Sequence, residues 1–216
     1  MDDEFGKLIA ALSRVYGFIK QTLSTMGIGM SSFISFLKTE QGKKLAEAAL
    51  RSIGTQYLET QRVVVLGKNK IRVKLDAPPK LPFDGAEIEA HFGSGWVTVE
   101  KRKDGQLYVG GRKVILHVSE CQKDGKKIKG YELCEELTGK TVLNANILDA
   151  LLEFTHLIPE DWKEKTVFFW GTIYRNSDGY LCVRFLFWGG SRWHWCCYCL
   201  GGDFDGRDPA ALLASS

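Results

Sequence analysis

Four residues near the C-terminus carry side chains that could bind a metal ion: His194, Cys196, Cys197 and Cys199. Histidine and cysteine are common zinc ligands, and a structural zinc ion needs four of them in a tetrahedron. Residues 192–200 are typical of a β-strand, in which successive side chains point to opposite faces. His194 and Cys196 then share one face, whereas Cys197 and Cys199 face the other way. We therefore predict no metal site and no cofactor here.

Other motifs that would indicate catalysis are missing from the sequence. It contains no glycine-rich phosphate loop, no HExxH and no GxSxG. An enzyme would need several titratable groups to meet in one pocket, for example His117, Cys121, or Asp161 with Glu160. The run 203–206 resembles a fragment of a calcium loop but lacks the remaining ligands. We expect a non-catalytic protein and keep an enzyme with an unrecognised site as an alternative.

The composition argues against two further classes of protein. The 216 residues carry a net charge of +3, with basic residues scattered among acidic ones, so nucleic acid is not the expected partner. A nucleic-acid-binding β-rich protein remains an alternative, through exposed aromatics and basic hairpins. No run of about 20 apolar residues occurs, so we predict no membrane span. The acidic start, Met1-Asp2-Asp3-Glu4, is unlike a signal peptide and favours a cytoplasmic location with reduced cysteines.

The residues after Gly190 show an unusual mixture. Asparagine is encoded by AAC or AAT, and randomising only the adenines gives Cys, His, Gly, Arg, Asp, Ser, Tyr and a few others. Tryptophan codons that such changes would leave intact flank these positions, as at Trp193 and Trp195. The pattern is that of adenine-directed mutagenesis of an asparagine-rich template. The residues that fall in this set are His194, Cys196, Cys197, Gly201, Gly202, Asp205, Arg207 and Asp208.

Hydrophobic periodicity predicts an α+β fold in three parts. Residues 1–54 have helical spacing and form a helical pair, with Gly54 ending the second helix. Residues 55–140 alternate at period two and form a β-rich module, with hairpins at 62–75 and 96–118 and a strand at 128–133. Residues 141–216 begin with a helix that Asn144 or Asn146 caps, and continue with antiparallel strands at 168–175, 180–188 and 192–200.

The run from Trp96 to Ser216 resembles uncharacterised proteins of small-genome bacteria of the candidate phyla. The ends of those proteins look like variable proteins of diversity-generating retroelements. Where the resemblance would place tryptophans, this chain has Cys199 and Phe204, and adenine changes do not explain Cys199. The shared runs are Gly130-Tyr131-Glu132-Leu133, Leu143-Asn144-Ala145-Asn146, Leu157-Ile158-Pro159-Glu160-Asp161-Trp162, Phe168-Phe169-Trp170-Gly171-Thr172-Ile173-Tyr174-Arg175 and Pro209-Ala210-Ala211-Leu212-Leu213-Ala214.

The resemblance implies a C-type-lectin-like C-terminal module that binds a protein or another macromolecule through a hypervariable segment. Buried tryptophans would hold the strand while the diversified residues face the ligand. The N-terminal helices lie outside the resemblance and could form a homo-oligomer. The implied framework is Trp188, Trp193, Trp195 and Leu200. The implied ligand-binding positions are Gly189, His194, Cys196, Cys197, Gly201, Gly202, Asp205, Arg207 and Asp208.

Overall fold

The computed structural model describes residues 2–215, with the side chains of residues 10–53 and 61–215. The chain divides into two compact units, Met1–Thr60 and Gln61–Ser216. The first boundary therefore falls after residue 60 instead of residue 54. The boundary expected after residue 140 separates no compact units, because strands from both sides of it pair in one sheet.

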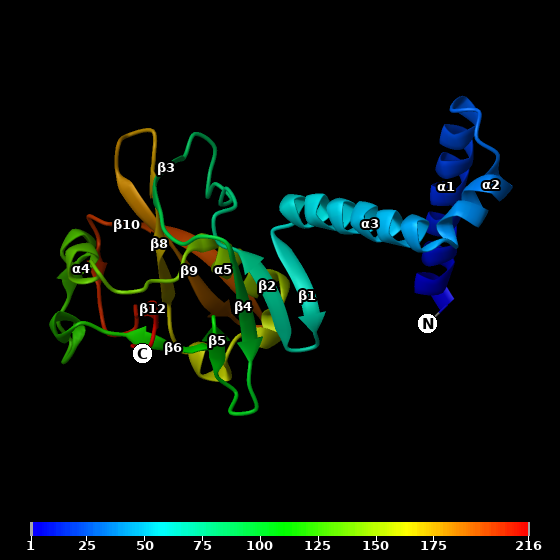
Figure 1. Ribbon diagram of the computed structural model, residues 1–216. Coiled ribbons are helices and arrows are strands. Elements are labelled where there is room, and N and C mark those ends of the chain that lie inside the picture. Colours follow the sequence, from blue (N-terminus) through cyan, green and yellow to red (C-terminus); the bar gives the residue numbers. More distant parts are fainter. Residues whose placement is uncertain (1, 216) are drawn as a thin grey trace. The chain divides into compact units, whose positions relative to one another are not determined.

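The first unit contains three α-helices where the sequence predicted two: α1 (Asp2–Thr25), α2 (Met30–Leu37) and α3 (Glu40–Thr60) (Figure 1). The second predicted helix is broken at Thr39, whose Oγ1 accepts a hydrogen bond from Gly42 N at 3.0 Å and so caps α3. Gly54 does not end α3, since one glycine costs a helix only about 1 kcal/mol. None of the described helices is long and apolar enough to cross a bilayer.

The second unit is built on a large, mostly antiparallel sheet. Among the described residues its order is β1-β2-β4-β5-β6-β12-β8-β9-β10, with β3 paired to β8. The predicted hairpins at 62–75 and 96–118 are confirmed, but the sequence did not predict β3. The strands are β1 (Val63–Gly67), β2 (Lys70–Lys74), β3 (Glu87–His91), β4 (Trp96–Lys101), β5 (Leu107–Val109), β6 (Arg112–His117), β8 (Val167–Arg175), β9 (Leu181–Gly189), β10 (Arg192–Cys199) and β12 (Ala210–Leu213).

The predicted strand at 128–133 is wrong for most of its length. Only β7 (Ile128–Lys129) is extended, and it pairs with β11 (Asp203–Phe204) in a separate two-stranded sheet. The chain then forms helix α4 (Gly130–Glu136). Gly130, Leu133 and Leu137 are buried at helical spacing, and six residues are too few to distinguish that spacing from a strand.

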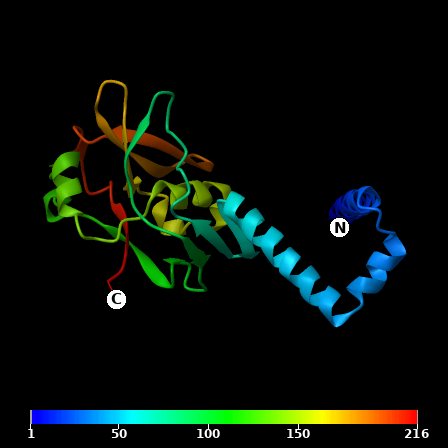
Figure 2. The ribbon, with the colours of Figure 1, turned by 45° about the horizontal axis from the view of Figure 1, so that its top comes forward.

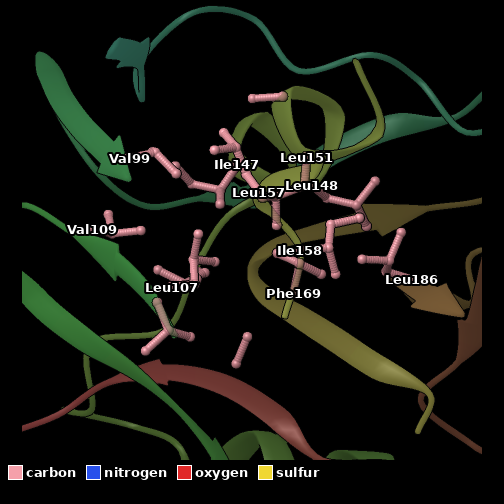
Figure 3. Close-up of a cluster of buried hydrophobic side chains, with 14 of the residues drawn as sticks. Val99, Leu107, Val109, Ile147, Leu148, Leu151, Leu157, Ile158, Phe169 and Leu186 are labelled. Carbon is pink, nitrogen blue, oxygen red and sulfur yellow. The ribbon is translucent and has the colours of Figure 1, made fainter. Parts of the chain in front are cut away.

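Helix α5 (Ala145–Glu153) occupies the centre of the second unit and contacts β2, β8 and β9 (Figure 2). Asn144 caps it as predicted, because Asn144 Oδ1 accepts a hydrogen bond from Ile147 N at 3.3 Å. Figure 3 shows Ile147, Leu148 and Leu151 packed against side chains of the sheet. Three short 3₁₀ turns, at Glu120–Gln122, Thr155–Leu157 and Glu160–Trp162, complete the described unit.

Candidate functional site

The C-terminal segment begins with β10, an edge strand. β10 pairs with β9 along its whole length, from Arg192 opposite Gly189 to Cys199 opposite Cys182. No other described strand pairs with it. A ligand that approaches along this edge could therefore reach side chains on both faces as well as unpaired backbone groups.

The two faces of β10 differ in what they contact. His194 lies on one face with Cys196 and Tyr198, and its ring stacks on Phe187 with centroids 5.4 Å apart. The opposite face carries Trp193, Trp195, Cys197 and Cys199. The positions of this strand that the resemblance implies to be variable are therefore divided between two faces, as the alternation of a strand requires.

Burial separates the two expected classes of residue only in part, because Leu200 alone of the expected framework residues is buried. Leu200 is 1% exposed. Trp188 and Trp193 are half-buried and contact each other edge to face, with centroids 5.3 Å apart. Trp195 is 39% exposed, so the expectation that it holds the strand by burial is wrong. The reason is its place on an edge strand, where no further described strand or helix covers it.

Trp195 instead contacts a buried ion pair that the sequence did not predict. The Arg184 guanidinium lies 4.2 Å from the centre of the Trp195 ring, and Arg184 Nη2 donates a 2.8 Å hydrogen bond to Asp149 Oδ1. The Arg184 side chain is 2% exposed. The signal that could have found it is a lone charged residue in the otherwise uncharged run 181–188.

The loop after β10 is fixed by a buried ring. Phe204 is 0% exposed and packs on Tyr198, Phe168 and Trp170, with centroids 5.2, 4.9 and 5.3 Å away. A Cβ at Gly202 would lie 2.5 Å from the outer end of the exposed Tyr198 ring, so a larger residue there requires that ring to move. Phe204, at a position where the resemblance would place a tryptophan, therefore fixes this loop to the core.

Polar contacts hold the rest of this loop. Gln122 Nε2 donates to the carbonyl oxygens of Asp205 at 2.7 Å and Asp208 at 3.2 Å. Burial raises the pKa of Asp208, whose Oδ2 accepts a hydrogen bond from Asp205 N. Asp205 pairs with Arg207 at 3.0 Å, and this hydrogen-bonded partner lowers the pKa of Asp205.

Both carboxylates of the run 203–206 form ion pairs with basic side chains. Asp203 accepts a hydrogen bond from Lys129 Nζ at 2.7 Å, and Asp205 accepts one from Arg207. Among the described residues, no three His, Cys, Asp or Glu side chains are placed to hold a metal ion. Cys199 instead faces Cys182, with the two Sγ atoms 3.1 Å apart.

The candidate catalytic residues His117 and Glu160 contact different partners and do not contact each other. His117 Nε2 lies 2.8 Å from Glu136 Oε1, and the other oxygen of Glu136 accepts a hydrogen bond from the Ser119 hydroxyl. Glu160 pairs with Lys163 at 2.5 Å, and Cys121 is exposed. Ser119 and His117 thus contact the same carboxylate, whereas a catalytic nucleophile would be hydrogen-bonded to its base directly.

Basic side chains of the second unit commonly pair with acidic ones, as Lys70 and Arg102 do with Glu100 and Arg175 does with Glu89. Such pairing reduces the positive potential that nucleic acid would require.

Comparison with protein-family models, with curated proteins and with solved structures gave no match.

Proposed function

We propose that this chain is a non-catalytic ligand-binding protein whose C-terminal segment, on a C-type-lectin-like module, is a surface diversified by a retroelement. One observation carries the proposal: all of the diversified positions named above are exposed or half-buried, whereas Leu200 and Phe204 between them are 1% and 0% exposed. Surface substitutions usually change stability by no more than about 0.5 kcal/mol, whereas truncating a core side chain costs about 2–5 kcal/mol. The segment can therefore change its surface and keep its backbone.

The scaffold also holds both ends of the segment. β10 is paired with β9 at its start, and β12 returns the chain into the sheet between β6 and β8. Phe204 fixes the middle. A rigid backbone with variable side chains is the arrangement that antibody paratopes use. We expect a protein or another macromolecule as the ligand.

Homo-oligomerisation through the N-terminal helices is part of the proposal. Leu12, Val15, Tyr16 and Phe18 of α1 are each more than half exposed. Contiguous exposed apolar side chains are typical of association surfaces. A second copy would also bring a second variable segment, and two linked sites bind a multivalent ligand more tightly than one.

The direct test is to sequence the 3′ end of the coding region in many individual cells of one population. We expect substitutions to concentrate in the diversified codons and to leave those of Trp193, Leu200 and Phe204 unchanged. A neighbouring reverse transcriptase gene and an imperfect copy of this coding end should accompany them. Substitutions spread evenly along the gene would refute the proposal.

A second test uses purified protein. A variant with His194, Cys196 and Arg207 all replaced by asparagine should unfold at nearly the parent urea concentration. The matched control, Phe204→Asn, places one polar side chain in the core and should be strongly destabilised. If the triple variant unfolds as readily as the control, the segment is core and not a diversified surface.

A further inference from the structure

The segment that joins α1 to α2 and continues through α2 is apolar, uncharged and exposed. Residues 21–37 contain no charged side chain, and we call them the apolar tip. Met26 is 66% exposed, Ile28 39% and Ile34 45%, and no side chain of α2 is buried. Single exposed apolar side chains are common on proteins, whereas several of them in one uncharged segment are typical of an interaction site.

The backbone of the loop in this tip is held by its own hydrogen bonds. Gly27, with φ +70°, donates from its N–H to the Ser24 carbonyl oxygen at 3.1 Å. Ile28 N donates to the Leu23 carbonyl oxygen at 2.9 Å. These two bonds form a Schellman motif, which ends α1. Because both donors are paired, the neighbouring apolar side chains can leave water without leaving these backbone groups unsatisfied.

Basic side chains border the apolar tip on both sides. Lys20 precedes it and Lys38 follows it, and both residues are exposed. No acidic residue occurs in the sequence between Glu4 and Glu40. Lysine stems can lie along an apolar surface while their ammonium groups reach anionic phosphates. A second copy placed tip to tip would instead bring like charges together. The charge around the tip therefore favours an anionic lipid surface as its partner.

We propose that the apolar tip inserts into the surface of an anionic lipid bilayer without crossing it. Met26, Ile28 and Ile34 enter the boundary between head groups and acyl chains. Lys20 and Lys38 stay at the level of the phosphates. The tip contains no diversified position, so this proposal and that of the diversified surface can fail separately.

The apolar tip also differs from the α1 surface proposed above for self-association. That surface ends at Phe18, and about 12 Å of helix separates Phe18 from Met26. The chain can therefore self-associate through α1 and bind lipid through the tip. Two linked tips would bind a membrane more tightly than one.

The test is flotation of the full chain with vesicles of phosphatidylglycerol and phosphatidylcholine. We expect binding that falls when phosphatidylglycerol is omitted or when salt is raised. Met26→Gln with Ile34→Gln should weaken binding about tenfold or more, because less apolar surface then leaves water. Leu45→Gln with Leu50→Gln is the matched control, since both leucines are exposed on α3 outside the tip. The control should bind like the parent, and far-UV circular dichroism should show that both variants keep their helices.

A second pair of variants separates local contact from the attraction of net charge. Lys20→Gln with Lys38→Gln should weaken binding to the anionic vesicles about 30-fold. Lys126→Gln with Lys127→Gln removes the same charge from an exposed turn of the second unit and should leave binding nearly unchanged.

A readout on the parent chain locates the contact. Bound vesicles should slow the chemical acetylation of Lys20 and Lys38 and leave that of Lys126 unchanged. Absence of binding to the anionic vesicles would overturn the proposal, and so would equal losses of binding in a variant and its matched control. If the glutamine variant of the tip changes the oligomeric state but not vesicle binding, a second copy covers the tip and the proposal is wrong.

Discussion

The buried ion pair between Arg184 and Asp149 gives the sharpest prediction. Asp149 is on α5 and Arg184 is on β9, so their 2.8 Å hydrogen bond joins the central helix to the strand that carries β10. Replacing Asp149 with asparagine keeps the size of the side chain but removes its charge. The Arg184 guanidinium, with its side chain 2% exposed, then has no counter-ion in this pair.

The expected loss follows from burial. Removing one partner of a buried ion pair costs about 3–5 kcal/mol. The Trp195 ring faces the guanidinium at 4.2 Å in the parent, and the substitution does not touch this contact, so it does not enter the difference. Asp149→Asn should therefore lose about 3–5 kcal/mol of stability. Arg184 Nε and Nη1 and Asp149 Oδ2 have no partners among the described residues, so the pair itself is imperfect. Replacing both residues, with Arg184→Met and Asp149→Leu, should consequently be nearly neutral.

Urea unfolding monitored by tryptophan emission measures this loss. All 6 tryptophans lie in the second unit, so the N-terminal helices do not contribute to the signal. Glu160→Gln is the control, because it breaks a pair with Lys163 on the surface and should leave the midpoint unchanged. The reasoning fails if Asp149→Asn unfolds at the parent midpoint, or if the double variant is as unstable as the single one.

Three further outcomes are expected. Gly130→Ala should lower the urea midpoint, because the new Cβ would lie 2.6 Å from the Leu200 carbonyl oxygen. Gly201→Ala, which has open space around it, should leave the midpoint unchanged, and equal midpoints for the two variants would contradict this prediction. Hydrogen peroxide should join Cys182 and Cys199, the two thiols losing their hydrogens as peroxide becomes two waters, because their Sγ atoms are 3.1 Å apart on paired residues. Peptide mapping would show the disulfide, and Cys199→Ser should abolish it. Burial raises the pKa of Cys182 to about 12, so Cys182 should react with iodoacetamide more slowly than Cys199 at mildly alkaline pH. Burial tends to raise the pKa of Glu136, but hydrogen bonds from Ser119 and His117 outweigh it and lower that pKa. Ionised Glu136 therefore stabilises the fold at pH values above the ordinary glutamate pKa, and this stabilisation is lost as pH falls through the lowered pKa. The urea midpoint of the parent should fall more steeply on acidification than that of Glu136→Gln, and parallel curves would refute this.

The elements that sequence reasoning predicted are those with strong local signals. The hairpin at 62–75 alternates at period two around a short polar turn, and the cap at Asn144 precedes a clear apolar stripe. The strand expected at 128–133 failed because a run of six residues is too short to reveal its period, although Gly130 and Leu133, three positions apart, are buried as a helix requires. β3 was missed because its residues, Glu87–His91, are partly charged and lie mostly on the surface.

In the candidate site, too, the sequence predicted what local pattern determines and missed what depends on tertiary packing. Alternation along 192–199 is enough to place His194 and Cys196 on one face, and the observed pairing with β9 agrees. Burial of Trp195 does not follow from that alternation. An aromatic side chain is buried only if another element covers it, and nothing in its own segment says whether one does.

The sequence by itself determined the periods of the hairpin strands, their turns and the helix cap at Asn144. These follow from interactions between residues a few positions apart. The tertiary structure alone decided that β10 is an edge strand, that Arg184 meets Asp149 across 35 positions, and that Phe204 packs on Phe168 and Trp170. Each of these depends on which distant segments pack together, and that is fixed by the burial of the whole core and not by any local pattern.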